Sequence, residues 1–123
     1  MSEPQIPQQR RATVRARVRV PVTVTIDGER LRGNTLDLSE GGAVCAVTAG
    51  SAGPLPVPGS ALEAELVLDT ERVWLAGAVL DAVHRRGWWI LTVRFVDPAE
   101  RDQDQVREHV FTALRRERSK GFR

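Results

Sequence analysis

The sequence predicts an all-β fold, a small six-stranded antiparallel β-barrel with a C-terminal α-helix. Several short stretches alternate apolar with polar residues and are separated by Gly, Pro, Asn or Asp, as in half-buried antiparallel strands. One stretch near the C-terminus has helical periodicity instead. With 123 residues, 41% of them hydrophobic, the chain is long enough for one domain with its own core.

The N-terminal part predicts an arm followed by a β-hairpin. Residues 1–9 carry three Gln and two Pro, and we expect them to form a flexible arm. Valines alternate with polar residues from Val18 to Ile26, which predicts the first strand, and Pro21 within it favours an edge or bulged position. An Asp-Gly dipeptide then predicts a tight turn, and residues 31–36 the second strand.

Four more strands and a helix complete the expected domain, which spans residues 10–118. Both alternating sets of residues are apolar from Val73 to Val83, which suits a strand that is buried on both faces or bent around a barrel. Three helix-start signals, Asp97 at the N-cap, Pro98 at the first helical position and Glu100 at N3, predict a helix over about 98–116. Residues 119–123 are expected to form a disordered tail. The other strands are expected at residues 43–47, 61–68 and 88–96, and the buried helical stripe at Val106, Val110, Ala113 and Leu114.

Composition limits the classes of function. Cys45 is the only cysteine, so no internal disulfide can form and a reducing cytoplasm is the expected location. No apolar run approaches the ~20 residues of a membrane span, and the N-terminus lacks the apolar core of a signal peptide. We do not expect an enzyme or a metal site, because His84 and His109 have no nucleophile or ligand pattern near them. Cys45 lies within an expected strand and should be buried and unreactive.

Two groups of residues point to a binding site. Five arginines and no acid occur between Arg10 and Arg19, in a chain with seventeen Arg and one Lys. A GC-rich genome would explain this bias, but a guanidinium group also makes forked contacts to phosphates and to the O6 and N7 atoms of guanine.

The second group is Asp37-x-Ser39-x-x-Gly42. A tight turn alone would explain it, with side chains bonding to their own backbone. Its carboxylate could also accept two hydrogen bonds from guanine, Ser39 could support the base or a backbone group, and Gly42 could let the backbone approach a planar ligand. The two groups together therefore complement both edges of a guanine nucleotide.

These segments resemble the PilZ domain family. The resemblance rests on "RRATVR" at residues 10–15, "VPV" at 20–22, "NTLDLSEGG" at 34–42 and "VRFVD" at 93–97. It runs from about Arg10 to Leu114. The family is marked by an Arg-x-x-x-Arg arm and an Asp/Asn-x-Ser-x-x-Gly turn at about this separation. Two features depart from it: Thr92 stands where many members have Gly, and "ATV" lacks the aromatic residue or Pro often found between the arginines.

The resemblance implies a receptor or adaptor domain that binds the bacterial second messenger cyclic di-GMP, with an Arg-rich arm that closes over the ligand. Arg11 and Arg15 would contact guanine edges and phosphates, in preference to the alternative register of Arg15 and Arg19. A basic residue directly before the first arginine often goes with two intercalated ligand molecules per chain, so Arg10 suggests that stoichiometry. The other implied ligand-binding residues are Asp37, Ser39, Gly41 and Gly42.

Two alternatives stay open. The first is a basic small β-barrel that binds RNA or DNA phosphates, which gives no role to Asp37 because a carboxylate repels phosphate. The second is a PilZ-like adaptor that acts through protein contacts without a ligand. The sequence does not identify a downstream protein partner, and Trp74, Trp88 and Trp89 are expected mainly in the core or flanking it.

Overall fold

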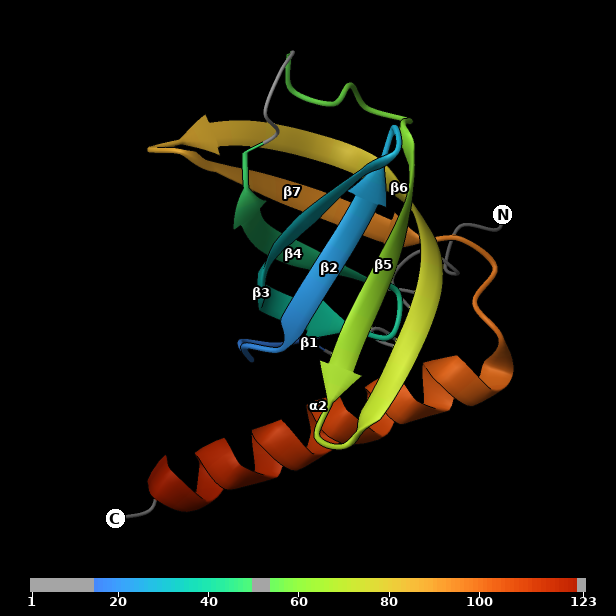
Figure 1. Cartoon of the computed structure of the whole chain (residues 1–123). Helices are drawn as coiled ribbons and strands as arrows, with labels where there is room; N and C mark the ends of the chain where they lie inside the picture. Colours follow the sequence, from blue (N-terminus) through green and yellow to red (C-terminus); the bar gives the residue numbers. More distant parts are fainter. Residues whose placement is uncertain (1–14, 50–53, 122–123) are drawn as a thin grey trace, which may run out of the picture.

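The computed structural model describes residues 15–49 and 54–121, with side chains described as far as residue 118. The expected N-terminal arm therefore lies outside the described residues. The described part contains seven strands and one helix (Figure 1): β1 (Arg15–Ala16), β2 (Pro21–Ile26), β3 (Glu29–Ser39), β4 (Gly42–Thr48), β5 (Ala61–Leu68), β6 (Glu71–Arg85), β7 (Trp88–Phe95) and α2 (Glu100–Gly121).

Six of the strands form a closed antiparallel barrel. They follow the order β3-β2-β5-β6-β7-β4, and pairing between β3 and β4 closes the circle. The short β1 adds to the end of β3, where Arg15 is opposite Ser39. Figure 1 shows α2 lying across one end of the barrel. The predicted barrel with a C-terminal helix is confirmed.

The barrel interior is filled mainly by aliphatic side chains from alternate positions of each strand. Burial alternates along β2, β4 and β5, as expected for strands with one face inside. Helix α2 packs Val106 and Val110 against this core, with Ala113 and Leu114 partly buried beside them. The predicted apolar stripe of the helix therefore faces the barrel.

The expected first strand from Val18 is wrong at its beginning, because β2 starts only at Pro21. In the segment before Pro21, the backbone of Val18 and Val20 forms hydrogen bonds with the buried Thr35 and not with a neighbouring strand in a regular β-ladder. Thr35 Oγ1 accepts from Val20 N at 2.9 Å and donates to Val18 O at 2.6 Å, and Thr35 N donates to Val20 O at 2.9 Å. This clamp fixes the segment that leads from β1 to β2.

The second and fifth barrel strands are longer than expected and each contains a β-bulge. β3 runs to Ser39, past the expected end at residue 36, with a register shift between Thr35 and Asp37. β6 has a similar shift between Val79 and Asp81. Its exposed positions include Leu80, so β6 is bent around the barrel and not buried on both faces.

The helix differs from expectation at both ends. It begins at Glu100, and the Ala99 carbonyl accepts the first helical bond from Gln103 N at 2.9 Å. Asp97 has a left-handed φ of 44° and forms the bend before the helix, so it is not the N-cap. The helix continues to Gly121, past the expected end at 116 and into the expected tail, because Arg, Glu and Lys are good helix formers. Residues 122–123 lie outside the described part.

Candidate functional site

The bulge in β3 decides where Asp37 points. Before the bulge, Leu31 and Thr35 face the barrel interior, and strict alternation would place Asp37 inside as well. The extra residue Leu36 shifts the alternation, so that Leu38 is buried and Asp37 is partly exposed. A carboxylate therefore lies on the outer face of the barrel, near the end of β3.

Arg15 lies on the same face as Asp37. It is opposite Ser39 in the β1–β3 pairing, and its Nη1 is 3.8 Å from Asp37 Oδ2. The side chains of Arg15 and Asp37 are 66% and 30% exposed. The distance is too long for a hydrogen bond, so both groups keep their hydrogen-bonding capacity for a ligand.

Ser39 organises the turn that follows it. Its Oγ accepts from Gly41 N at 3.3 Å and from Gly42 N at 3.2 Å, and it donates to Gly42 O at 3.3 Å. The residue is buried. Of the two roles expected from the sequence, the structure places Ser39 in contact with backbone groups.

Gly42 is required by the packing of two strands. A Cβ atom at this position would lie 2.2 Å from the Val93 carbonyl oxygen of β7. Any side chain would therefore force β4 and β7 apart, whether or not a ligand is bound. The sequence suggested a tight turn or the approach of a ligand as the reason for this glycine, and it did not reveal the close approach of β7.

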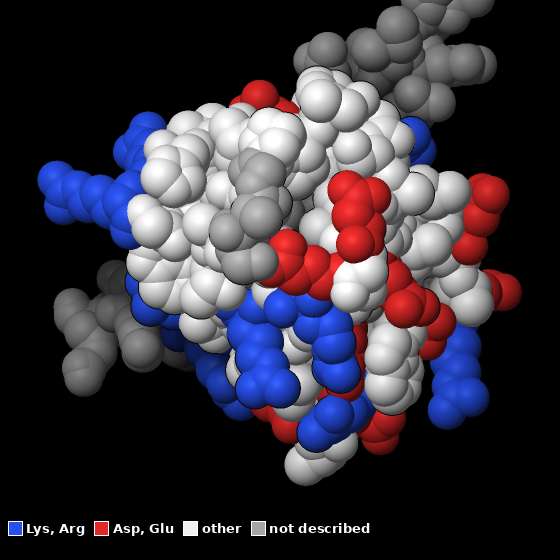
Figure 2. Space-filling view, turned by 45° about the horizontal axis from the view of Figure 1, so that its top comes forward, with Lys and Arg blue, Asp and Glu red and all other residues white. Residues whose placement is uncertain are grey.

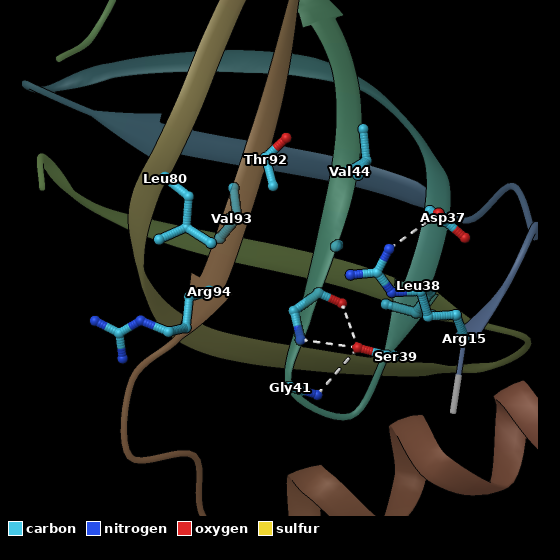
Figure 3. Close-up of a pocket in the computed structure, with 12 residues that line it drawn as sticks. Arg15, Asp37, Leu38, Ser39, Gly41, Val44, Leu80, Thr92, Val93 and Arg94 are labelled. Atoms are coloured by element: carbon cyan, nitrogen blue, oxygen red, sulfur yellow. Dashed lines mark hydrogen bonds and ion pairs between the residues drawn. The ribbon is translucent and has the colours of Figure 1, made fainter. Parts of the chain in front are cut away.

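These residues line a hollow of about 210 Å³ on the outer face of β3, β4 and β7 (Figure 3). Asp37, Val44 and Thr92 form one cross-strand row, and Ser39, Gly42 and Arg94 form the next. Arg15 and Arg94 lie at opposite sides of the pocket, separated by small residues. The position of Thr92, noted as a departure from the family pattern, thus lines the pocket.

Sequence reasoning missed Arg94, Val44 and Leu80 as lining residues. Arg94 lies in the same "VRFVD" stretch used for the family resemblance, and its alternation with Val93 and Phe95 places it on the outer face. That alternation was the available signal. Leu80 lies in β6 at the bulge between Val79 and Asp81, and the sequence does not reveal that β6 borders the pocket.

Helix α2 holds the turn of this site through an ion pair. Arg107 Nε and Nη2 each lie 2.7 Å from Glu40 Oε1, and Arg107 Nη1 lies 2.6 Å from Asp104 Oδ1. The hydrogen bond that Arg107 donates to Glu40, together with the negative charge of this carboxylate, raises the pKa of the Arg107 guanidinium above its ordinary value. Glu40 therefore anchors the β3–β4 turn to helix α2.

The other residues singled out from the sequence lie in the pocket, in the core or outside the described part. Arg10 and Arg11 lie outside the described residues, and Gly41 lies in the β3–β4 turn that lines the pocket. Cys45 is buried, as expected, and burial raises the pKa of its thiol to about 12. Of the tryptophans, only Trp89 is buried.

The described part of the chain lacks two features. It contains no group of three or more His, Cys, Asp or Glu side chains placed to hold a metal ion. It also contains no helix with the length and hydropathy needed to cross a membrane.

Solved structures with the same fold include PilZ domains. The PilZ domain of YcgR from Escherichia coli, solved with c-di-GMP, has a TM-score of 0.73 and 18% identity, covering 94% of this chain and 99% of that one. The motility inhibitor MotI/DgrA from Bacillus subtilis has a TM-score of 0.69 and 21% identity; 91% of this chain matches 53% of MotI. This chain therefore spans about half the length of MotI.

The PilZ domain of CeSA from a cellulose-synthesizing bacterium is 26% identical, with a TM-score of 0.58, and covers 80% of this chain and 96% of that chain. No curated protein matches the sequence. The family model of the PilZ domain matches residues 9–112, which is most of the chain. The chain therefore belongs to the PilZ domain family.

Proposed function

We propose that this domain is a non-enzymatic receptor or adaptor for cyclic di-GMP and binds a guanine base of the ligand in the pocket beside β3. One observation carries the proposal. An exposed arginine and an outward-facing carboxylate, Arg15 and Asp37, lie 3.8 Å apart at the edge of a pocket in a PilZ fold. The similar domain of YcgR was solved with this ligand. The proposal includes a cytoplasmic location, where this second messenger acts.

The two side chains suit different edges of guanine. The Asp37 carboxylate would accept hydrogen bonds from N1–H and N2–H of the base, while Arg15 would donate a fork to O6 and N7 or to a phosphate. Arg94, on the opposite side of the pocket, would meet a phosphate. Ser39, Gly41 and Gly42 would keep the turn in the shape that supports the base.

The pocket is too small to enclose the whole dinucleotide. Its 210 Å³ falls below the ~300–1,000 Å³ of sites that enclose a drug-sized ligand. Further contacts must therefore come from outside it, and we assign them to Arg10 and Arg11. Their closure over the ligand, and the binding of two intercalated ligand molecules, belong to the proposal.

The nucleic-acid alternative requires an extended basic surface. Figure 2 shows one face on which acidic and basic side chains lie next to one another. In the described residues Arg30 and Arg72 both pair with Glu65, so part of the basic charge is neutralised locally. An outward carboxylate at Asp37 also disfavours a phosphate backbone in the pocket. We therefore favour the nucleotide ligand.

Isothermal titration calorimetry with cyclic di-GMP and cyclic di-AMP tests the proposal. We expect cyclic di-GMP to bind at least about thirty-fold more tightly, because adenine lacks the two donors that Asp37 would accept; this corresponds to about 2 kcal/mol. Asp37→Ala should remove most of this preference.

Equal affinity for the two nucleotides, with a steep dependence on salt, would instead support the nucleic-acid alternative. Absence of binding to either nucleotide would support a PilZ-like adaptor without a ligand. The calorimetric stoichiometry separates one from two ligand molecules per chain.

Amide hydrogen exchange tests the closure of the arm. We expect exchange of residues 8–17 to slow when cyclic di-GMP is added, because ordering the backbone on the ligand protects its amides. Protection in residues 34–42 without any change in residues 8–17 would show ligand binding without closure of the arm.

A further inference from the structure

A second hollow lies on the outer face of the barrel, on the same strands as the pocket. It has a volume of about 370 Å³ and is lined by four apolar residues from β3, β4 and β7: Leu36, Ala46, Trp88 and Ile90. We call it the Trp88 groove. Trp88 is 43% exposed and Leu36 is 38% exposed, so the groove presents a large aromatic ring and a leucine to solvent.

Three arginines, Arg19, Arg85 and Arg86, also line this groove. None of them forms an ion pair with a carboxylate in the described part of the chain. No carboxylate of a described residue lines the groove either. The groove therefore combines an apolar surface with positive charge that no described acid balances.

The groove adjoins the proposed ligand pocket. Ala46 follows Val44 of the pocket by two residues in β4, and Ile90 precedes Thr92 by two residues in β7. Two residues of a strand span about 7 Å. In β3 the two hollows meet at the bulge, where Leu36 lines the groove and the next residue lines the pocket.

We infer that the Trp88 groove is a docking site for an acidic segment of a partner protein that inserts an apolar side chain. Aromatic and arginine residues dominate the binding energy of protein interfaces. An apolar side chain would cover Trp88 and Leu36, while flanking Asp or Glu residues would pair with the arginines. This inference goes beyond the proposed function, and it does not depend on which nucleotide the pocket binds.

The lining of the groove favours a peptide over a nucleotide base. Asn34 is its one side chain, among the described residues, able to accept a hydrogen bond from the amino group of a base. The pocket, in contrast, offers the Asp37 carboxylate. A second copy of this chain is the other possible occupant, and the test distinguishes it.

Fluorescence anisotropy with labelled synthetic peptides tests the inference on the whole chain. The probe is a short peptide with a central Leu-Phe pair between Asp and Glu residues. One control peptide replaces the acids by Lys, and another replaces Leu-Phe by Gly-Gly. We expect only the acidic apolar peptide to bind, since it alone satisfies both the charge and the apolar surface.

Two variants and two matched controls locate the binding. Trp88→Thr and Arg85→Glu should each weaken binding at least about ten-fold, as expected for central interface residues. Trp74→Thr changes another exposed tryptophan, which lines a different hollow, and Arg101→Glu reverses an exposed charge on α2; both should leave the affinity unchanged. Thermal unfolding confirms that each variant is folded.

Three results would overturn the inference. In the first, the acidic apolar peptide binds no more tightly than the control peptides, or all four variants weaken its binding equally. The second is Trp88-dependent self-association in analytical ultracentrifugation, which would assign the groove to a second copy of the chain. The third is Trp88-dependent binding of a single-stranded oligonucleotide in preference to the peptide.

Discussion

Arg15→Ala should separate ligand binding from folding. The wild-type side chain is 66% exposed, and its nearest described carboxylate, Asp37, is 3.8 Å away and itself 30% exposed. Exposed ion pairs of this kind contribute about 0–1 kcal/mol. For a chain of this size we therefore expect the melting temperature to fall by no more than about 4 °C.

The effect on binding should be much larger. A forked contact between arginine and guanine is worth about 1–3 kcal/mol, and a loss of ~2 kcal/mol weakens binding about thirty-fold. Calorimetry with cyclic di-GMP and differential scanning fluorimetry measure the two quantities on the same samples. The expected result is therefore a large loss of affinity at nearly constant stability.

Arg17→Ala is the matched control. Arg17 lies two residues from Arg15, is exposed, and does not line the pocket. Its replacement should leave the affinity within about two-fold, since a surface charge outside the site contributes little. Equal losses of affinity in the two variants would mean that general positive charge attracts the ligand, and a melting temperature lowered by well over 4 °C in Arg15→Ala would mean that Arg15 serves the fold.

Three further predictions concern the site and the core. Gly42→Ala would place a Cβ atom 2.2 Å from the Val93 carbonyl oxygen, so we expect a loss of about 1–3 kcal/mol in urea unfolding; unchanged stability would contradict the close approach of the strands. Ser39→Ala leaves the Gly41 and Gly42 amides without their hydroxyl acceptor and should cost about 1 kcal/mol in the same assay, whereas a neutral effect would mean that solvent replaces the hydroxyl. Burial raises the pKa of Cys45 from 9.0 to about 12, so its contribution to stability is complete below pH 9 and declines as the pH rises towards 12. Urea unfolding below and above pH 9 should show a steeper decline for the wild type than for Cys45→Ala, and equal slopes would contradict the shift.

Local pattern predicted the strands where one residue set is apolar and the other polar. The strand at residues 61–68 was predicted with both its ends, because Leu and Ala alternate there with Glu. The first strand was placed too early because Val18 and Val20 continue the alternation. Their backbone groups form hydrogen bonds with Thr35, which lies seventeen residues after Val18 and fifteen after Val20, and no local pattern encodes such a contact.

In the candidate site too, local features were predictable from the sequence and tertiary contacts were not. Residue types and spacing predicted that Arg15 and Asp37 share one site, and the structure brings Arg15 Nη1 to 3.8 Å from Asp37 Oδ2. Their ligand chemistry stays a prediction. The roles of Ser39 and Gly42 were only partly readable. They depend on a turn and on the approach of β7, which are tertiary features. Arg94 was missed because it enters the pocket from a strand more than fifty residues away in sequence.

The bulge at Leu36 makes the length of β3 as important as its composition. Without the bulge, the same residues would alternate strictly along β3. The Asp37 side chain would then point into the apolar interior of the barrel, where an unpaired carboxylate is strongly disfavoured. Homologous chains that pair this strand without the bulge would therefore lose the acidic face of the strand even with every motif residue retained. Sequence comparisons that score only residue identity would overlook such a change.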